Sequence, residues 1–194
     1  MKAAVYYGPN KLEIDDVAEP EVRPGTVKLQ VGYNGICGTD LHEYYAGPIF
    51  VPTQPHPLTH QELPLTLGHE FSGTITAVGA GVTGWREGDR VAVEPIYKCG
   101  HCGPCAAGNY NVCQQIGFHG LMSDGGMAEY TVVPTNMLHR LPDNVSLELG
   151  ALVEPMSVAY HAATLGDVSP GDTAMVFAGS IDMCTRITER LKKE

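Results

Sequence analysis

Residues 73–91 read GTITAVGAGVTGWREGDRV, and this stretch decides the fold class. Its two ends are strand-like runs, and the loop between them is rich in glycine. Short strands joined by tight turns are typical of an antiparallel barrel rather than of alternating helices and strands. Upstream, residues 26–31 (TVKLQV) alternate like a strand, and 19 of the 23 glycines precede residue 145. We therefore predict a mainly β fold with few helices.

The clearest helix signal comes late, at residues 146–165. Ser146 is a suitable N-cap, and the apolar residues that follow recur at helical spacing. Pro155 is expected to break or kink this helix, because proline cannot donate the backbone hydrogen bond.

Beyond that helix, the apolar run at residues 173–178 (TAMVFA) predicts a buried parallel strand. The glycine-rich G-x-G-x-x-G loop of a dinucleotide-binding domain does not follow it, and residues 181–194 read instead as a short charged helix. We expect one domain at residues 1–150, a connecting helix and the first strand of a truncated Rossmann domain at residues 151–180, and an unmatched tail at residues 181–194.

Charge and hydropathy narrow the class of protein. A net charge of -10 over 194 residues argues against nucleic acid or an anionic membrane as a partner, because such surfaces require clustered Lys and Arg. The chain shows neither a signal-peptide core nor about 18 consecutive apolar residues, so we expect a cytoplasmic protein that does not cross a membrane. In that compartment the six cysteines point to metal binding or catalysis rather than to disulfides.

Four cysteines form the strongest local motif: Cys99, Cys102, Cys105 and Cys113, in the pattern C-x-x-C-x-x-C-x(7)-C. Four thiolates at this spacing suit a closed tetrahedral zinc site, which leaves no open position for substrate and is therefore structural. Two disulfides, scattered thiols or an iron–sulfur cluster are the alternatives. His101 lies inside the motif and is a less suitable ligand than the four cysteines.

A second metal site is suggested by Cys37, His69 and Glu154. Cys37 follows a predicted strand, His69 precedes another, and Glu154 lies beside the proline of the late helix. Three protein ligands leave a fourth position for water or an alcohol oxygen, which is the arrangement of a catalytic zinc. The spacing alone is weak evidence, because more than 30 residues separate Cys37 from His69.

The motifs resemble those of the zinc-dependent medium-chain alcohol and polyol dehydrogenases. Four segments occur in the order seen in that family: residues 35–42 (GICGTDLH), residues 68–73 (GHEFSG), the four-cysteine motif and residues 152–155 (LVEP). Residues 41–52 (LHEYYAGPIFVP) look like the butanediol dehydrogenase branch. The resemblance covers about residues 1–180.

The resemblance implies a GroES-like barrel and a dehydrogenase that oxidises a small secondary alcohol or diol with NAD or NADP, and it allows a homo-oligomer. It makes Cys37, His69 and Glu154 the catalytic-zinc ligands, with Glu70 able to exchange with water. Thr39 would accept the alcohol proton and His42 would pass it to solvent. Taken without the family, Thr39 could be a helix N-cap and His42 a surface histidine.

Two hypotheses remain at this point. The first is an enzyme by family whose cofactor domain is largely missing from this chain, so that the chain alone is inactive or nearly so. The second is a non-catalytic, zinc-binding GroES-like fragment or interaction partner. The substrate and the choice between NAD and NADP stay open in both.

Overall fold

A computed structural model of the chain describes residues 1–176 and 181–192. The strands are β1 Lys2–Gly8, β2 Lys11–Asp16, β3 Thr26–Asn34, β4 Leu65–Thr66, β5 Phe71–Val78, β6 Arg90–Val93, β7 Ile96–Tyr97, β8 Gly117–Phe118, β9 Tyr130–Pro134 and β10 Leu138–Arg140. The α-helices are α1 Gly38–Ala46, α2 Gly103–Ala106, α3 Leu147–Ala151, α4 Val153–Leu165 and α5 Ile181–Leu191. Two short 3₁₀ turns lie at Tyr110–Val112 and Thr135–Met137.

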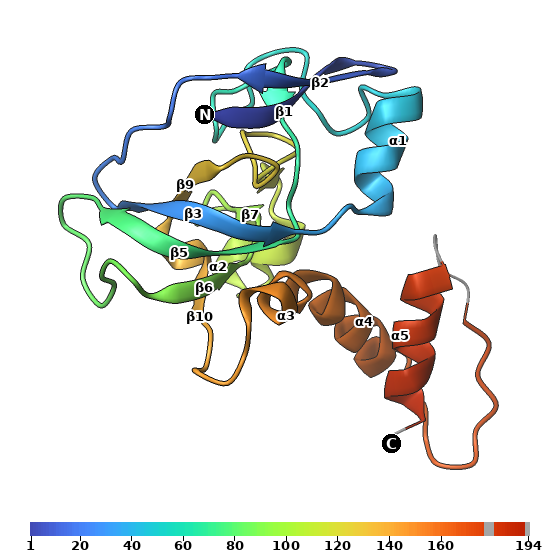
Figure 1. Ribbon diagram of the computed structural model, residues 1–194. Helices are drawn as coiled ribbons and strands as arrows, with labels where there is room; N and C mark the ends of the chain where they lie inside the picture. The colour runs from blue at the N-terminus through green and yellow to red at the C-terminus, as the bar shows by residue number, and fades with distance from the viewer. Residues whose placement is uncertain (177–180, 193–194) are drawn as a thin grey trace.

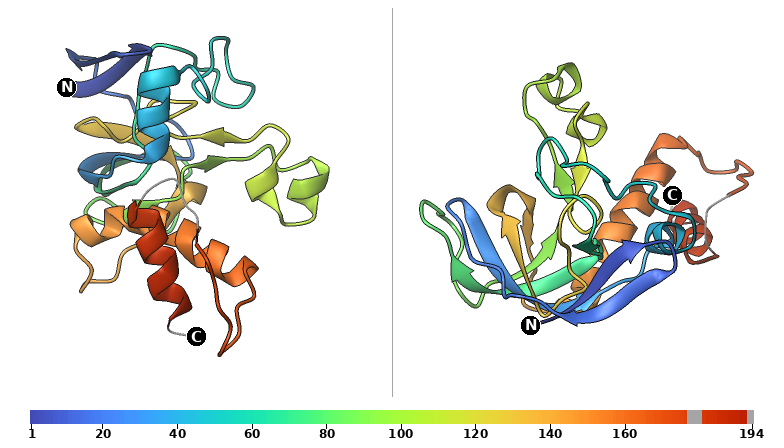
Figure 2. Two further views of the ribbon diagram at one scale, coloured as in Figure 1. Left: turned by 90° about the vertical axis from the view of Figure 1, so that its right-hand side faces the viewer. Right: turned by 90° about the horizontal axis from the view of Figure 1, so that it is seen from above.

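The strands form three antiparallel sheets. A five-stranded sheet in the order β10-β6-β5-β3-β9 curls into half a barrel, and a three-stranded sheet in the order β2-β1-β4 lies above it in Figure 1. The pair β7-β8 forms the base of a lobe that extends away from the barrel (Figure 2). These sheets confirm the mainly β prediction, and β5 and β6 flank the glycine-rich loop as expected.

The main core lies inside the curled sheet. Its nine buried residues come mostly from alternate positions of β3, β5, β6 and β9, as expected when one face of a sheet packs inward. They are Val27, Leu29, Phe71, Ile75, Val91, Val93, Val133, Met137 and Leu138. A second, smaller cluster holds β1 and β4 against the loops beside them: Tyr6, Val51, Leu65, Leu67 and Leu121.

The late helix forms, in two pieces. The Ser146 side chain accepts the backbone N–H of Leu149 at 3.2 Å and so caps α3, as predicted. The break falls at Leu152, between α3 and α4, and Pro155 lies in the first turn of α4. A proline is tolerated in a first turn because its missing N–H has no helical partner there, so the helix restarts ahead of the proline.

The strand expected at residues 173–178 does not form in the part of this segment that the structure describes. Residues 173–176 form no strand, and Met175 is 80 % exposed, while residues 177 and 178 lie outside the described part of the chain. A parallel strand needs a neighbouring strand to satisfy its backbone, and none of the strands in the described part of the chain pairs with this segment. The helix predicted in the tail does form, as α5, and it packs on α4 (Figure 1). The division into segments at residues 150 and 180 stays a prediction.

Among the described residues, no helix is long and apolar enough to span a bilayer.

Candidate metal centres

The four cysteines predicted to bind one zinc lie together in the lobe between β7 and β8. The sulfur atoms of Cys99, Cys102, Cys105 and Cys113 all lie within 4.8 Å of one another, and all four are free thiols. His101 is not a member of this group, and its Nδ1 lies 2.9 Å from the Cys99 carbonyl oxygen. The geometry therefore offers four sulfur ligands to one ion.

Backbone N–H groups point at these sulfurs. The Cys113 Sγ accepts from the N–H of Cys99 at 3.3 Å and of Gln115 at 3.4 Å, and the Cys99 Sγ accepts from the N–H of Cys102 at 3.4 Å. Backbone donors lower the pKa of the Cys102 thiol to about 6 and also lower that of Cys113, whereas burial raises the pKa of Cys105 to about 12. Donors aimed at sulfur favour the thiolate, the form that binds a metal.

The second centre is assembled by strand register. Strands β3 and β5 run antiparallel with Asn34 opposite Phe71, so the end of β3 lies beside the start of β5. The Gly35 N–H continues this pairing by donating to the Glu70 carbonyl oxygen at 2.7 Å. Segments more than 30 residues apart in sequence thereby bring their side chains together.

Three side chains meet at this junction. Cys37 is the N-cap of α1, and its sulfur and the ligand atoms of His69 and Glu70 all lie within 4.8 Å of one another. Glu154, in the first turn of α4, is not a member of this group, although its charge and that of His69 interact. Of the two carboxylates considered from the sequence, the structure brings Glu70 into the cluster and leaves Glu154 at a greater distance.

Asp40 is a site residue that the sequence reasoning missed. It is 4 % exposed, its Oδ2 accepts the Cys37 N–H at 2.9 Å, and its Oδ1 lies 3.5 Å from the His69 Nδ1. Asp40 therefore links the Cys37 backbone to the His69 ring. Its position three residues after a helix N-cap, where an acidic side chain reaches back to the N-cap N–H, was the available signal.

Thr39 and His42 lie on α1, three residues apart and so on one face of the helix. Thr39 is partly buried, with its hydroxyl oxygen 3.6 Å from the Cys37 sulfur, and His42 is exposed. Cys37, not Thr39, is the N-cap of this helix, which removes the purely structural interpretation of Thr39. Helix α1 therefore places Thr39 beside the cluster and His42 at the protein surface.

The charges at the cluster are strongly coupled. Burial alone lowers the pKa of His69, but Asp40 and Cys37 outweigh it and raise that pKa to about 10. Burial raises the pKa of Glu70, and it raises that of Glu154 to about 7. A divalent metal bound here would displace the proton of His69 and favour the ionised form of these carboxyl groups, because its positive charge lies beside them.

Gly35 leaves the space that Glu70 fills, which leads to a testable prediction. A Cβ added at Gly35 would collide with the Glu70 carboxylate oxygen, so Gly35→Ala is expected to push Glu70 away from the cluster. We expect the zinc affinity of this centre to fall by about 10- to 100-fold, the range typical of disturbed ligand support. Competition with a chromogenic chelator measures it.

The matched control is Gly38→Ala, since an added Cβ there meets no atom within 4 Å. Gly38 is the first residue of α1, next to Cys37, so the control tests the same local backbone. Equal zinc affinity in the two variants would contradict the placement of Glu70 as a ligand.

Comparison with known proteins gives consistent matches. The family model described as the alcohol dehydrogenase GroES-like domain matches residues 23–143. The (R,R)-butanediol dehydrogenase of Bacillus subtilis (strain 168) is 48% identical over 180 residues, which cover 91% of this chain and 51% of that protein.

Solved structures agree with the sequence comparison. The 2R,3R-butanediol dehydrogenase of Bacillus subtilis superposes with a TM-score of 0.91 at 45% identity, covering 99% of this chain and 55% of that chain. An alcohol dehydrogenase of Escherichia coli CFT073, crystallised with its cofactor NADH, gives a TM-score of 0.86 at 35% identity over 99% of this chain and 53% of that one. The chain spans about half the length of the relatives it matches.

Proposed function

Because the chain belongs to the family of the alcohol dehydrogenase GroES-like domain, we propose that it carries the alcohol-binding zinc centre of an NAD- or NADP-dependent alcohol or diol dehydrogenase. The observation that carries the proposal is the convergence of Cys37, His69 and Glu70 on one point. The similarity to butanediol dehydrogenases supports a small secondary alcohol or diol as substrate.

The residues of the cluster fit a zinc ion. Cysteine sulfur, imidazole nitrogen and carboxylate oxygen are the three ligand types that zinc takes, and three protein ligands are characteristic of catalytic sites. Asp40 Oδ1 and His69 Nδ1 are buried, lie 3.5 Å apart and have no hydrogen-bond partner among the described residues, so each is the other's nearest polar contact.

Each residue has a defined part in this proposal. Cys37, His69 and Glu70 hold the ion, and Glu154 is a further carboxylate within electrostatic reach. Asp40 orients the His69 ring through Nδ1, which leaves the other ring nitrogen for the metal. Zinc bound here would act as a Lewis acid toward an alcohol oxygen and favour loss of the alcohol proton.

The proton has a route along α1. We assign Thr39, partly buried beside the Cys37 sulfur, as the group that accepts the alcohol proton, and exposed His42 as the group that passes it to water. Hydride would pass to NAD or NADP, and the NADH bound to the Escherichia coli relative supports that choice of acceptor. The second zinc would occupy the four-cysteine lobe and be structural.

Metal content and cobalt spectroscopy test the proposal. Purified protein is expected to hold about two zinc ions per chain, matching its two ligand groups, and His69→Ala about one. Cobalt, which absorbs visible light, is then exchanged into the site, and butane-2,3-diol is added. We expect a saturable change in the cobalt bands that His69→Ala abolishes, while the bands of cobalt in the four-cysteine lobe persist.

Other outcomes have definite meanings. If cobalt binds at Cys37 and His69 but its absorption bands do not change when the diol is added, the alternative is favoured, namely a zinc-binding domain without catalysis. Failure of His69→Ala to lower the metal content would contradict the site itself.

A further inference from the structure

Glu154 comes to the metal centre from an element of its own. The clustered side chains of Cys37, His69 and Glu70 lie beside the end of β3 or the start of β5. Glu154 lies in the first turn of α4 instead. A single residue, Leu152, joins α4 to α3, because it ends one helix and begins the other. The position of Glu154 relative to the cluster therefore depends on how α3 is held on the barrel.

Ser72 holds α3 against the strand that follows two of the clustered residues. It lies in β5, two residues after Glu70, and its side chain is completely buried. Its hydroxyl donates to the carbonyl oxygen of Leu147, the first residue of α3. The bond therefore joins the first turn of α3 to the strand that His69 and Glu70 directly precede.

The surfaces around this bond fit closely. A Cβ added at Gly32 of β3 would lie 2.6 Å from the Leu147 side chain, and one added at Gly150 of α3 would lie 3.0 Å from the Ser72 Cβ. Carbon atoms in contact are normally about 3.5–4.0 Å apart, so neither position has room for a side chain. The two glycines let α3 pack directly on β3 and β5. An interior packed at this density transmits a displacement instead of absorbing it.

Arg90 attaches the same helix to β6. Its guanidinium group donates to the carbonyl oxygens of Val145 at 2.8 Å and of Pro142 and Asp143 at 3.1 Å each. These three residues form the turn that leads into α3. Hydrogen bonds from a charged donor are stronger than those between neutral groups. Helix α3 is therefore fixed at its entrance by β6 and in its first turn by β5.

We propose that Ser72 is a positioning residue of the metal centre, and that its bond to Leu147 sets the distance between Glu154 and the clustered side chains, given that zinc binds there as proposed above. The charge of the partly buried Glu154 carboxylate interacts with those of His69 and Glu70. An ion held beside these two residues is attracted by the same carboxylate, and the attraction falls as the distance grows. Without the Ser72 bond, α3 moves outward and carries Glu154 away from the ion.

A double-mutant cycle on zinc affinity tests the proposal. Ser72→Ala and Glu154→Gln are each expected to weaken zinc binding at this centre by about 10-fold, the lower end of the range for disturbed ligand support. The two changes combined are expected to weaken it no more than Glu154→Gln alone, because Ser72 acts through Glu154. Competition with a chromogenic chelator gives the affinity. The zinc of the four-cysteine lobe, whose ligands stay unchanged, is the internal reference.

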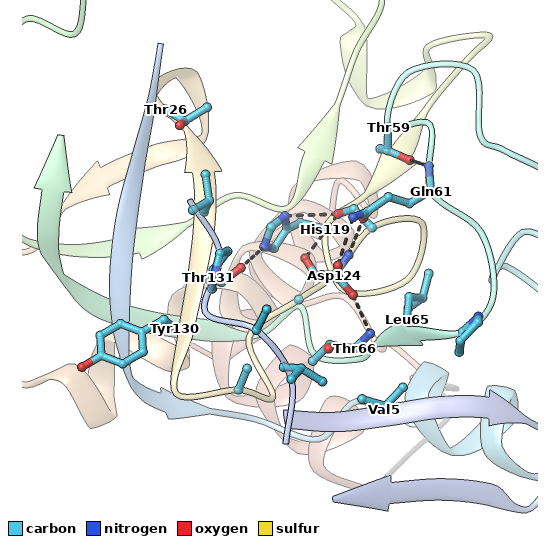
Figure 3. A pocket seen from close by; sticks show the side chains of 18 of the residues that line it. Val5, Thr26, Thr59, Gln61, Leu65, Thr66, His119, Asp124, Tyr130 and Thr131 are labelled. Carbon is cyan, nitrogen blue, oxygen red and sulfur yellow. Dashed lines mark hydrogen bonds between the residues drawn. The ribbon is translucent and has the colours of Figure 1, made fainter. Parts of the chain in front are cut away.

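Thr131→Val is the matched control, because it removes another buried hydroxyl from the barrel sheet. Thr131 is 3 % exposed, and its hydroxyl oxygen lies 2.8 Å from the His119 Nε2 at the pocket shown in Figure 3. The zinc affinity of the centre is expected to stay unchanged in this variant.

Arg90→Gln reaches α3 by the other attachment and leaves the buried Ser72 in place, so it tests the same link even if Ser72→Ala does not fold. We expect it to weaken zinc binding, and to have no further effect in a Glu154→Gln background.

Two results would overturn the proposal. The first is equal weakening by Ser72→Ala with and without Glu154, since Ser72 would then act on its own strand. The second is unchanged zinc affinity in both Ser72→Ala and Arg90→Gln. If the zinc centre itself were wrong, His69→Ala would leave the metal content unchanged, a result that sets failure of the proposed function apart from failure of the link through α3.

Discussion

Replacing Cys113 by serine is expected to lower the zinc content by about one ion per chain and to unfold the lobe at residues 98–116 locally. Cys113 is 4 % exposed, and its sulfur accepts two backbone N–H groups in addition to facing the other three cysteines. The lobe contains few buried apolar residues, so the metal supplies most of its stability. Metal analysis gives the zinc content, and hydrogen exchange of the lobe amides reports the loss of structure.

Two controls sharpen this prediction. Cys184→Ser removes a cysteine that the sequence places outside both motifs, and zinc content should not change. The cobalt response to diol at Cys37 and His69 should survive in Cys113→Ser, because the two centres lie on separate parts of the fold. Loss of both ions from Cys113→Ser would contradict the independence of the centres.

The second large effect is expected at Glu43, whose side chain is completely buried. Its carboxylate accepts the backbone N–H groups of Ile49, Phe50 and Val51, and Tyr6 donates to its carbonyl oxygen at 2.6 Å. Glu43→Ala would keep the carbonyl oxygen that Tyr6 contacts but leave the N–H groups of Ile49, Phe50 and Val51 without their acceptor, and is expected to reduce the free energy of unfolding by about 3–5 kcal/mol. Urea unfolding measures this value.

Glu43→Gln keeps one acceptor oxygen in place, so its cost should be clearly smaller. Exposed Glu62 provides the control, and Glu62→Ala is expected to stay within about 0.5 kcal/mol of the original protein. If Glu43→Ala cost no more than Glu62→Ala, the loop at residues 49–51 would have to be held by other contacts.

The parts of the fold that depend on neighbouring residues were predictable from sequence. Strands β3 and β5 follow from alternation between glycine turns, and α3 from the Ser146 cap. The four-cysteine group follows from spacing because all its members lie within 15 residues. In each case the information needed is local.

Features that depend on distant partners were not predictable in this way. The segment at residues 173–176 has a strand-like composition, but a strand exists only beside another strand. Cys37 and His69 come together only because β3 pairs with β5 in this register. From the sequence, the resemblance to the dehydrogenase family was needed to predict this contact. The contact of Asp40 with His69 depends on the same register.

The register of β3 and β5 also sets an order of events during folding. The four cysteines are close enough in sequence to collect a metal while most of the chain is still unfolded, since closing so short a loop costs little entropy. Cys37 and His69 come together only after two distant strands have paired, a non-local and therefore slow step. Metal binding at Cys37 and His69 would consequently report when the pairing of β3 with β5 is complete.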